Sequence, residues 1–397
     1  MVSSGFKSKQ RRGGDIRCVD VLIVSLGATG GLRAVDDELL ASLRRAGASA
    51  AIVRPEPPAS VRTLMLTDLR WALAARQAAM AELARTQARA LVYSTTTAAL
   101  LWPRPGAIRF DAPAATNRPG RHGLWQRPLE RRRLREATLL LAQSKGALLE
   151  TPVAVRAARS PGSALVLPVP VEPSMSHSAH ETSKASESEH LGETGKTSAS
   201  RISDESRKSS ASHTERDIAA ITYAANPAKK GLDIVLDAWR QASKPDEELI
   251  VAGVEERELR RLGYALPATG VRVVGMLAHE DYRALLCRAR AYVCAARRED
   301  YGIAQLEALA DGCMLVSTPS PGPYVALPLG RELDGRLVTA DLAATSLGIA
   351  LRTALDDPLS DYAQRALEAL VPFRRSAVDR LVAEQLLPAL LRGAKPV

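Results

Sequence analysis

Short apolar runs alternate with longer amphipathic stretches along most of this chain, and the alternation occurs twice. Val19–Ser25 is the clearest run, because consecutive Val, Leu and Ile side chains suit a parallel strand buried on both faces. Between such runs we expect helices, including one that ends near Ala46 and a helix-rich stretch over Val61–Arg89. The pattern predicts two α/β domains with doubly wound parallel sheets. The other expected strands are Ala50–Arg54, Ala90–Tyr93, Ile108–Phe110, Thr138–Ala142, Ala164–Leu167, Ile218–Tyr223, Glu248–Ala252, Val271–Gly275, Ala291–Ala295 and Met314–Ser317.

A serine-rich segment separates the two halves. Residues 174–216 hold too few apolar side chains to offset the entropy lost on ordering, so we predict a disordered linker there. It would join an N-terminal domain over 16–173 to a C-terminal domain over 217–397, with a disordered basic segment over 1–15. The length of 397 residues agrees with two domains of roughly 150–200 residues each.

Histidines and cysteines argue against several classes of site. Four of the six histidines lie in the predicted linker, which leaves only His122 and His279 in the expected folded parts. Two are too few for a histidine-rich metal site or a histidine-based triad. The four cysteines have no zinc-like spacing, so we expect reduced thiols in a cytoplasmic protein. No apolar run approaches the roughly 20 residues of a membrane-spanning helix.

The positive charge is concentrated in the first part of the chain. The formal net charge is +10, and residues 1–173 hold 26 Lys and Arg against 13 Asp and Glu. A solvated basic face would explain this excess, as would an anionic partner such as a phosphorylated acceptor, an anionic membrane surface or a nucleic acid. Nucleic acid is the weakest of these, because no aromatic residues are interleaved with the arginines. The densest group is Arg118, Arg121, Arg127, Arg131, Arg132, Arg133 and Arg135.

The stretch from Arg297 to Gly312 carries the most specific chemistry. An apolar strand runs into a charged loop, and a helix is expected to begin near Gly302 and to end at Gly312. The free backbone N–H groups at the start of such a helix form an anion site. Glu299 in the loop and Glu307 in the helix would suit two hydroxyl-bearing ends of one ligand with a phosphate between them. An ordinary strand–loop–helix with solvated acids is the alternative.

This stretch, EDYGIAQLEALADG, resembles the E-x7-E signature of the retaining glycosyltransferases of family 4. Three other segments of the C-terminal half follow the order of that family: Tyr223–Leu232 with its Lys-Gly, Leu249–Gly253 and Val271–Met276. Gly27–Gly31 resembles the glycine loop of the family's N-terminal domain. The resemblance implies the GT-B fold, in which two Rossmann-like domains face a cleft. It covers nearly all of the C-terminal half and, in layout more than in motif, the N-terminal half.

The resemblance also implies a reaction and roles for individual residues. The reaction is transfer of a hexose, with retention, from a nucleotide-diphosphate sugar to an acceptor that the sequence does not identify; a lipid or polysaccharide precursor is one candidate. Glu299 would contact sugar hydroxyls and Lys230 the diphosphate, while Glu307 would hold the ribose. We expect no metal and no cofactor apart from this donor substrate. The remaining expected donor-binding residues are Gly302, Ile303, Tyr301, Asn226, Gly30 and Gly31.

One departure from the family leaves other functions open. Ala225 stands where the family usually has an arginine that binds diphosphate, and Lys229, Asn226 or Arg297 are the candidates to replace it. The alternatives are a catalytically inactive donor-binding homologue and a basic module that binds membranes or polyanions. We expect a cytoplasmic protein, with peripheral contact at the inner face of an anionic membrane, and no nucleic-acid partner. The expected acceptor-side residues are Asp111, Arg118, Arg121, His122 and Arg127.

Overall fold

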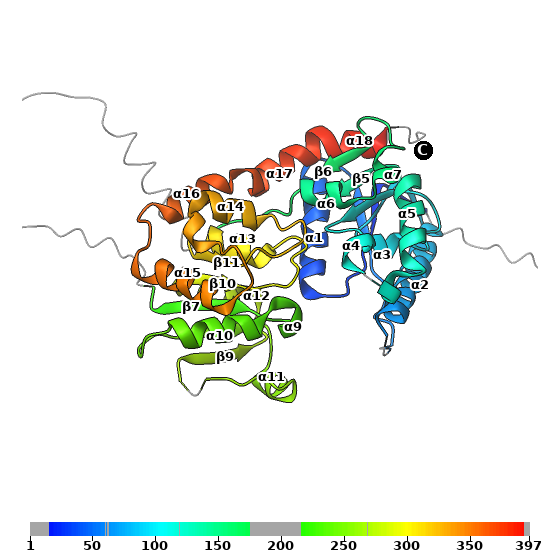
Figure 1. Ribbon diagram of the computed structural model, residues 1–397. Helices are drawn as coiled ribbons and strands as arrows, with labels where there is room; N and C mark the ends of the chain where they lie inside the picture. Colours follow the sequence, from blue (N-terminus) through cyan, green and yellow to red (C-terminus); the bar gives the residue numbers. More distant parts are fainter. Residues whose placement is uncertain are drawn as a thin grey trace, which may run out of the picture. The chain divides into compact units, whose positions relative to one another are not determined.

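The computed structural model divides into two compact units, each an α/β structure around one parallel sheet (Figure 1). It describes residues 16–59, 61, 63–118, 120–174, 216–267 and 269–392. The first unit contains the described residues up to Pro168 together with those from Val378 onward, and the second is Val169–Ala377. Two parallel-sheet α/β domains were predicted, and this fold class is confirmed. The predicted linker and the predicted basic segment at the N-terminus lie outside the described residues.

The first unit is built on a six-stranded sheet with the order β2-β1-β3-β4-β5-β6, in which all neighbouring strands are parallel. Every strand expected in this half is present. The chain order reverses between β1 and β3, so the loops after these two strands lie at a topological switch point, where ligands of such sheets bind. The strands are β1 (Arg17–Val24), β2 (Ala50–Val53), β3 (Thr86–Tyr93), β4 (Ala107–Phe110), β5 (Leu140–Ala142) and β6 (Ala164–Val166).

The helices of the first unit follow the predicted alternation, with one correction. The expected helix-rich stretch Val61–Arg89 ends as a helix at Leu83, and β3 begins at Thr86. Thr86 and Ala88 are buried and alternate with exposed neighbours, so this segment has the period of a strand and not of a helix. The helices are α1 (Gly30–Arg45), α2 (Leu64–Leu83), α3 (Thr96–Ala99), α4 (Ala114–Asn117), α5 (Gln126–Glu136), α6 (Lys145–Glu150) and α7 (Val153–Arg156), with the 3-10 turn η1 (Gly120–Gly123).

The helical segment from Val378 onward packs into the core of the first unit. A C-terminal domain extending to residue 397 was predicted, whereas the residues from Val378 onward belong to the first unit. The physical reason is burial, because four apolar side chains of this segment enter the hydrophobic core beside β1 and β3. They are Val378, Val382, Leu386 and Leu390. The segment contains the part of α17 (Arg375–Leu381) from Val378 onward, followed by η4 (Val382–Leu386) and α18 (Leu387–Leu391).

The second unit has a five-stranded parallel sheet with the order β11-β10-β7-β8-β9. The chain order reverses between β7 and β10, so the loops after these two strands meet at the switch point of this sheet. Its strands are β7 (Ile218–Tyr223), β8 (Leu249–Ala252), β9 (Val271–Gly275), β10 (Ala289–Cys294) and β11 (Met314–Ser317). Its main helices are α9 (Pro227–Lys230), α10 (Leu232–Ala242), α11 (Glu256–Arg261), α12 (His279–Arg288), α13 (Ile303–Ala310), α14 (Ala326–Leu333), α15 (Ala344–Asp356) and α16 (Tyr362–Ala369).

Candidate functional site

A tight turn after β7 brings the short helix α9 against the end of β10. Asn226 begins this helix, and its side-chain oxygen accepts a hydrogen bond from the N–H of Lys229 at 3.0 Å. Gly231 ends the helix with a φ of 64°. A Cβ atom at Gly231 would lie 2.0 Å from the carbonyl oxygen of Ala295, so only glycine fits. The turn therefore holds Lys229 and Lys230 over the switch point.

Lys230 and Glu299 form an ion pair at this point. Lys230 Nζ lies 2.6 Å from Glu299 Oε2, although the two residues are 69 positions apart in the chain. The side chains are 22% and 9% exposed, so the pair is largely withdrawn from water. Burial by itself lowers the pKa of Lys230, but the Glu299 carboxylate outweighs it and raises that pKa above the ordinary value for lysine. The ammonium group therefore stays charged at neutral pH.

A second ion pair lies beside the first. Lys229 Nζ contacts Asp300 Oδ2 at 2.9 Å, and Arg298 Nε contacts the other oxygen of Asp300 at 2.7 Å. Gln305, in the first turn of α13, donates to Glu299 Oε2 at 3.2 Å. The acidic loop is thus held from both sides, by the lysines of α9 and by an amide of α13. Asp300, Arg298 and Gln305 were not among the predicted site residues.

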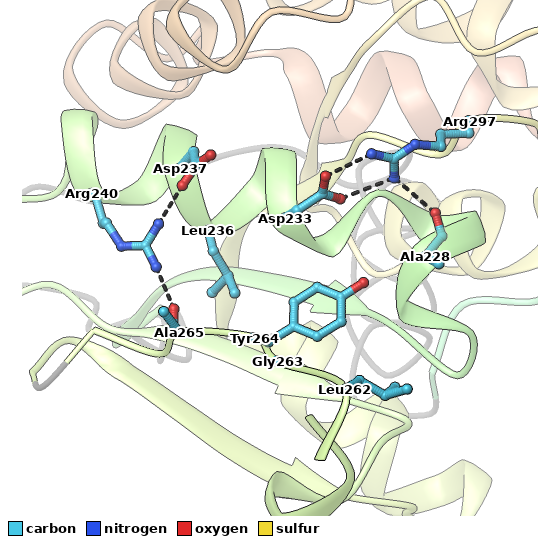
Figure 2. A pocket seen from close by; sticks show the side chains of 10 residues that line it. All are labelled: Ala228, Asp233, Leu236, Asp237, Arg240, Leu262, Gly263, Tyr264, Ala265 and Arg297. Atoms are coloured by element: carbon cyan, nitrogen blue, oxygen red, sulfur yellow. Dashed lines mark hydrogen bonds and ion pairs between the residues drawn. The ribbon is translucent and has the colours of Figure 1, made fainter. Parts of the chain in front are cut away.

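Arg297 lines a neighbouring pocket (Figure 2). Its guanidinium group binds the Asp233 carboxylate through two contacts of 2.9 and 2.6 Å and donates to the carbonyl of Ala228 at 2.8 Å. The pocket has a volume of about 490 Å³, and the ring of Tyr264 lies in it between α10 and the segment that follows α11. Of the candidates to replace the missing arginine, Arg297 is thus committed to clamping α9 and α10, and the Asn226 oxygen to capping α9.

The loop after β10 leads into α13 through a glycine in the left-handed region. Gly302 has a φ of 91°, and a Cβ there would lie 2.7 Å from the ring of Tyr324. The helix begins at Ile303, as predicted, so the N–H groups of its first turn have no partners within the helix. Tyr301 is buried, and its hydroxyl oxygen accepts a hydrogen bond from the N–H of Val169 at 2.8 Å. This places Tyr301 in the packing of the loop.

Glu307 contacts a histidine that the sequence left without a role. Its Oε1 lies 2.7 Å from Nε2 of His279, the first residue of α12. Glu307 is mostly buried and His279 mostly exposed. Nothing in the sequence pairs these residues, because they are 28 positions apart and meet only through the packing of α12 against α13. The only signal was that His279 is one of the two histidines outside the linker.

The predicted residues of the first unit include glycines with open space around them and two arginines that support the local fold. No atom lies within 4 Å of a Cβ built at Gly30 or Gly31, at the start of α1. Arg118 pairs with Asp68 at 2.9 Å, and Arg127 donates to the carbonyls of Gly120 and Gly123. The remaining acceptor-side candidates are Asp111 and Arg121, both exposed, and His122, whose side chain lies outside what the structure describes.

Two further features concern the described residues alone. None of their helices is long and apolar enough to cross a membrane. Their His, Cys, Asp and Glu side chains include no group of three placed to hold a metal ion.

Comparison with known proteins gives a match of part of the chain to one family model, and a shared fold with solved structures. Residues 203–369 match the model of the family glycosyl transferases group 1. Curated protein sequences include no match to this chain.

Several solved structures share the architecture at low sequence identity. Sucrose-phosphate synthase from Thermosynechococcus elongatus has a TM-score of 0.64 at 16% identity, covering 95% of this chain and 99% of that one. WaaG, a glycosyltransferase involved in lipopolysaccharide biosynthesis, has a TM-score of 0.58 at 13% identity over 92% and 99% of the two chains. HepE from Anabaena, in complex with UDP and glucose, has a TM-score of 0.56 at 15% identity over 93% and 99%.

Proposed function

We propose that this chain, which has the GT-B fold, is a glycosyltransferase that transfers a hexose from a nucleotide-diphosphate sugar, with retention, to a separate acceptor. The observation that carries this proposal is the Lys230–Glu299 pair, 2.6 Å apart at the switch point of the second sheet. HepE, which shares the fold, has been solved with UDP and glucose, and this supports a nucleotide-sugar donor.

The proposed chemistry requires a positive charge next to the diphosphate. Next to the sugar it requires a group that accepts hydrogen bonds from the sugar hydroxyls. The bond between the sugar C1 and the diphosphate oxygen breaks, and the nucleoside diphosphate leaves with the electron pair. The oxygen of an acceptor hydroxyl bonds to C1, and the proton of that hydroxyl passes to the leaving diphosphate. Lys230 would balance the charge that develops on the leaving diphosphate, assisted by the first-turn N–H groups of α13. Glu299 would bind sugar hydroxyls and Glu307 the ribose. The diphosphate would compete with Glu299 for Lys230, which frees carboxylate oxygens for the sugar.

We propose that Lys229 supplies the positive charge of the diphosphate-binding arginine, in whose usual position this chain has Ala225. Of the three candidates, Lys229 has the cation with the fewest contacts among the described residues: its ammonium contacts Asp300, whereas the Arg297 guanidinium binds both Asp233 and the Ala228 carbonyl. An ammonium about 4 Å from a phosphate charge is worth on the order of 4 kcal/mol at an effective dielectric of 20, before desolvation. This supports a second cation at the diphosphate.

We further propose that the acceptor side faces an anionic surface through α5. Arg131, Arg132 and Arg135 are exposed on this helix, and Arg132 contacts Glu136, four residues on. Arg133 is different, because its guanidinium lies 5.2 Å from the ring centre of Trp102 and serves packing. A phosphorylated acceptor and an anionic membrane are both compatible with this face.

A thermal-shift panel of UDP-, GDP- and ADP-sugars tests the donor. A ligand at 100 times its Kd adds about 2.7 kcal/mol to the free energy of unfolding, so one nucleotide series should raise the Tm clearly above the others. Release of nucleoside diphosphate from that donor then separates an enzyme from an inactive donor-binding homologue. If no nucleotide sugar changes the Tm, the donor site is wrongly assigned.

A further inference from the structure

The contact between His279 and Glu307 joins an exposed group to a largely buried one. The His279 side chain is 67% exposed and that of Glu307 is 12% exposed, and the two atoms that meet are 2.7 Å apart. His279 is at the beginning of α12, whose preceding residue, Ala278, caps the helix without a side-chain hydrogen bond. The ring can therefore turn into solvent with little loss of packing, while Glu307 stays in place on α13.

The surroundings make the contact sensitive to protonation. The hydrogen bond to Glu307 is the largest influence, and it raises the pKa of His279 above its ordinary value of about 6.5, against the opposing effect of burial. Two other charged groups face the ring: Arg283 of α12, which lowers this pKa, and Asp311 at the end of α13, which raises it. These two are bound to each other at 2.6 Å, so their effects largely cancel. On the same helix, Glu280 and Asp281 are the next charged side chains.

We infer that His279 is a gate on the ribose-binding carboxylate: in the free protein it holds Glu307 Oε1, and binding of a nucleotide displaces it and releases its proton. This rests on the proposed function, in which Glu307 binds the ribose hydroxyls. Both ribose hydroxyls need acceptor oxygens on a carboxylate, and one of the two oxygens is occupied by the imidazole. The ring therefore competes with the ribose for that oxygen, and binding of the ribose through both oxygens favours the state in which the ring has turned away.

The direction of the pH effect follows from linkage. His279 has a raised pKa in the free protein and returns toward the ordinary value when Glu307 turns to the ribose. Because the free state binds the proton more tightly, nucleotide affinity should rise as the pH increases from the ordinary pKa of histidine to the raised pKa of His279. Below and above that interval, the affinity should not change with pH. Because exposed ion pairs are weak, we expect the rise in nucleotide affinity over this pH interval to be about two- to fivefold.

Two measurements test the gate, the first without any nucleotide. NMR titration of His279 should give a pKa that falls to about 6.5 in Glu307→Gln. Calorimetry with UDP, GDP and ADP, in buffers of different ionisation enthalpy near pH 7, should then show more protons released on binding to the native protein than to His279→Gln. Gln keeps a neutral hydrogen-bond donor but cannot titrate. Taking the difference between the two proteins removes the titration of the terminal phosphate, which falls in the same pH range.

Arg272→Gln is the matched control, because it breaks another exposed ion pair of the second unit, that of Arg272 with Glu248 at 2.9 Å. It should leave proton release unchanged. If the pKa of His279 is the same in Glu307→Gln, or if His279→Gln releases as many protons as the native protein, the gate does not exist. If the native protein binds none of the three nucleotides, the proposed function fails and the gate falls with it; binding without the His279-dependent proton overturns the gate alone.

Discussion

At the scale of single residues, the site consists of acids that are already paired before any donor arrives. Lys230 holds Glu299, Lys229 holds Asp300, and His279 contacts Glu307. Each carboxylate of the proposed donor site thus has a counterpart that keeps it oriented. A donor bound at this proposed site would exchange these contacts for its own, and the exchange would be favourable for Lys230 because a diphosphate carries more charge than one carboxylate.

Replacement of Glu307 and replacement of Glu299 should impair different steps, nucleotide binding in the first case and turnover in the second. Glu307→Ala should weaken binding of the free nucleoside diphosphate by about 10- to 100-fold, since a hydrogen bond to a charged group contributes about 1.5–3 kcal/mol. Glu299→Ala should leave that binding within a few fold and instead abolish turnover of the donor. Calorimetry with the nucleoside diphosphate, next to a turnover assay, measures both. Equal losses of nucleotide affinity in the two variants would contradict the assigned roles.

At the scale of elements, the site depends on the turn that ends α9. Gly231→Ala should destabilise the second unit by more than the about 1–3 kcal/mol expected for a left-handed non-glycine residue, because the new Cβ would also meet the Ala295 carbonyl. It should weaken nucleotide binding as well, since the turn positions both lysines. Urea unfolding and calorimetry test this.

Gly263→Ala is the control for that variant. Gly263 has a φ of 82°, but nothing lies within 4 Å of a Cβ built there. It should therefore carry the backbone cost alone and leave nucleotide binding intact. Equal effects of the two substitutions would mean that the close approach to Ala295 is not what holds the turn.

The exposed face of α5 makes a second prediction at this scale. Replacing Arg131, Arg132 and Arg135 with Gln should weaken binding to anionic vesicles by about fivefold per residue at low salt, since each basic residue near such a surface contributes about 1 kcal/mol. Vesicle sedimentation at low and high salt measures this. Neutral vesicles should bind poorly throughout, because the attraction is screened over about 8 Å at physiological salt.

Three arginines of α11 provide the matched control for the vesicle experiment. Arg257, Arg260 and Arg261 are exposed on the second unit, so replacing them with Gln removes the same charge elsewhere. Equal losses from both triple variants would indicate non-specific attraction. If binding does not depend on vesicle composition, the exposed arginines of α5 either bind a soluble acceptor or are simply solvated.

The elements themselves were largely predictable from the sequence. Buried parallel strands such as Ile218–Tyr223 have short continuous apolar runs, and β7 has those bounds. The helix expected through Arg89 was too long, because Thr86–Arg89 mixes small and charged residues that suit either structure. Only its pairing with β1 decides the matter, and that pairing is tertiary.

The contacts within the site were less predictable than its elements. The resemblance to a family brought Lys230, Glu299 and Glu307 together, but not the partners Asp300 and His279. Both partners depend on how neighbouring helices and loops pack, across separations of 71 and 28 residues. The hydrophobic periodicity of a sequence carries no information about contacts between residues so far apart in the chain.

At the scale of the whole molecule, the residues from Val378 onward contribute to the core of the first unit. Leu386 is fully buried in the core beside β1 and β3. Leu386→Ala should destabilise the first unit by about 2–5 kcal/mol, the usual range for such a truncation in a core. Differential scanning calorimetry, with and without a nucleotide, should show that transition moving down while the ligand-stabilised transition of the second unit stays. A shift of both transitions together would mean that the units unfold as one.

The most direct test of the central claim is donor turnover followed by NMR of the anomeric proton, in the presence of EDTA. The account predicts that the native protein releases nucleoside diphosphate from one nucleotide sugar, and that the anomeric configuration of the transferred or hydrolysed sugar is retained. Lys230→Met should lower the rate by about 100- to 1,000-fold, as expected for removal of a group that stabilises developing charge. A Lys230→Met variant as fast as the native protein, an inverted product, or activity lost with EDTA would contradict the account.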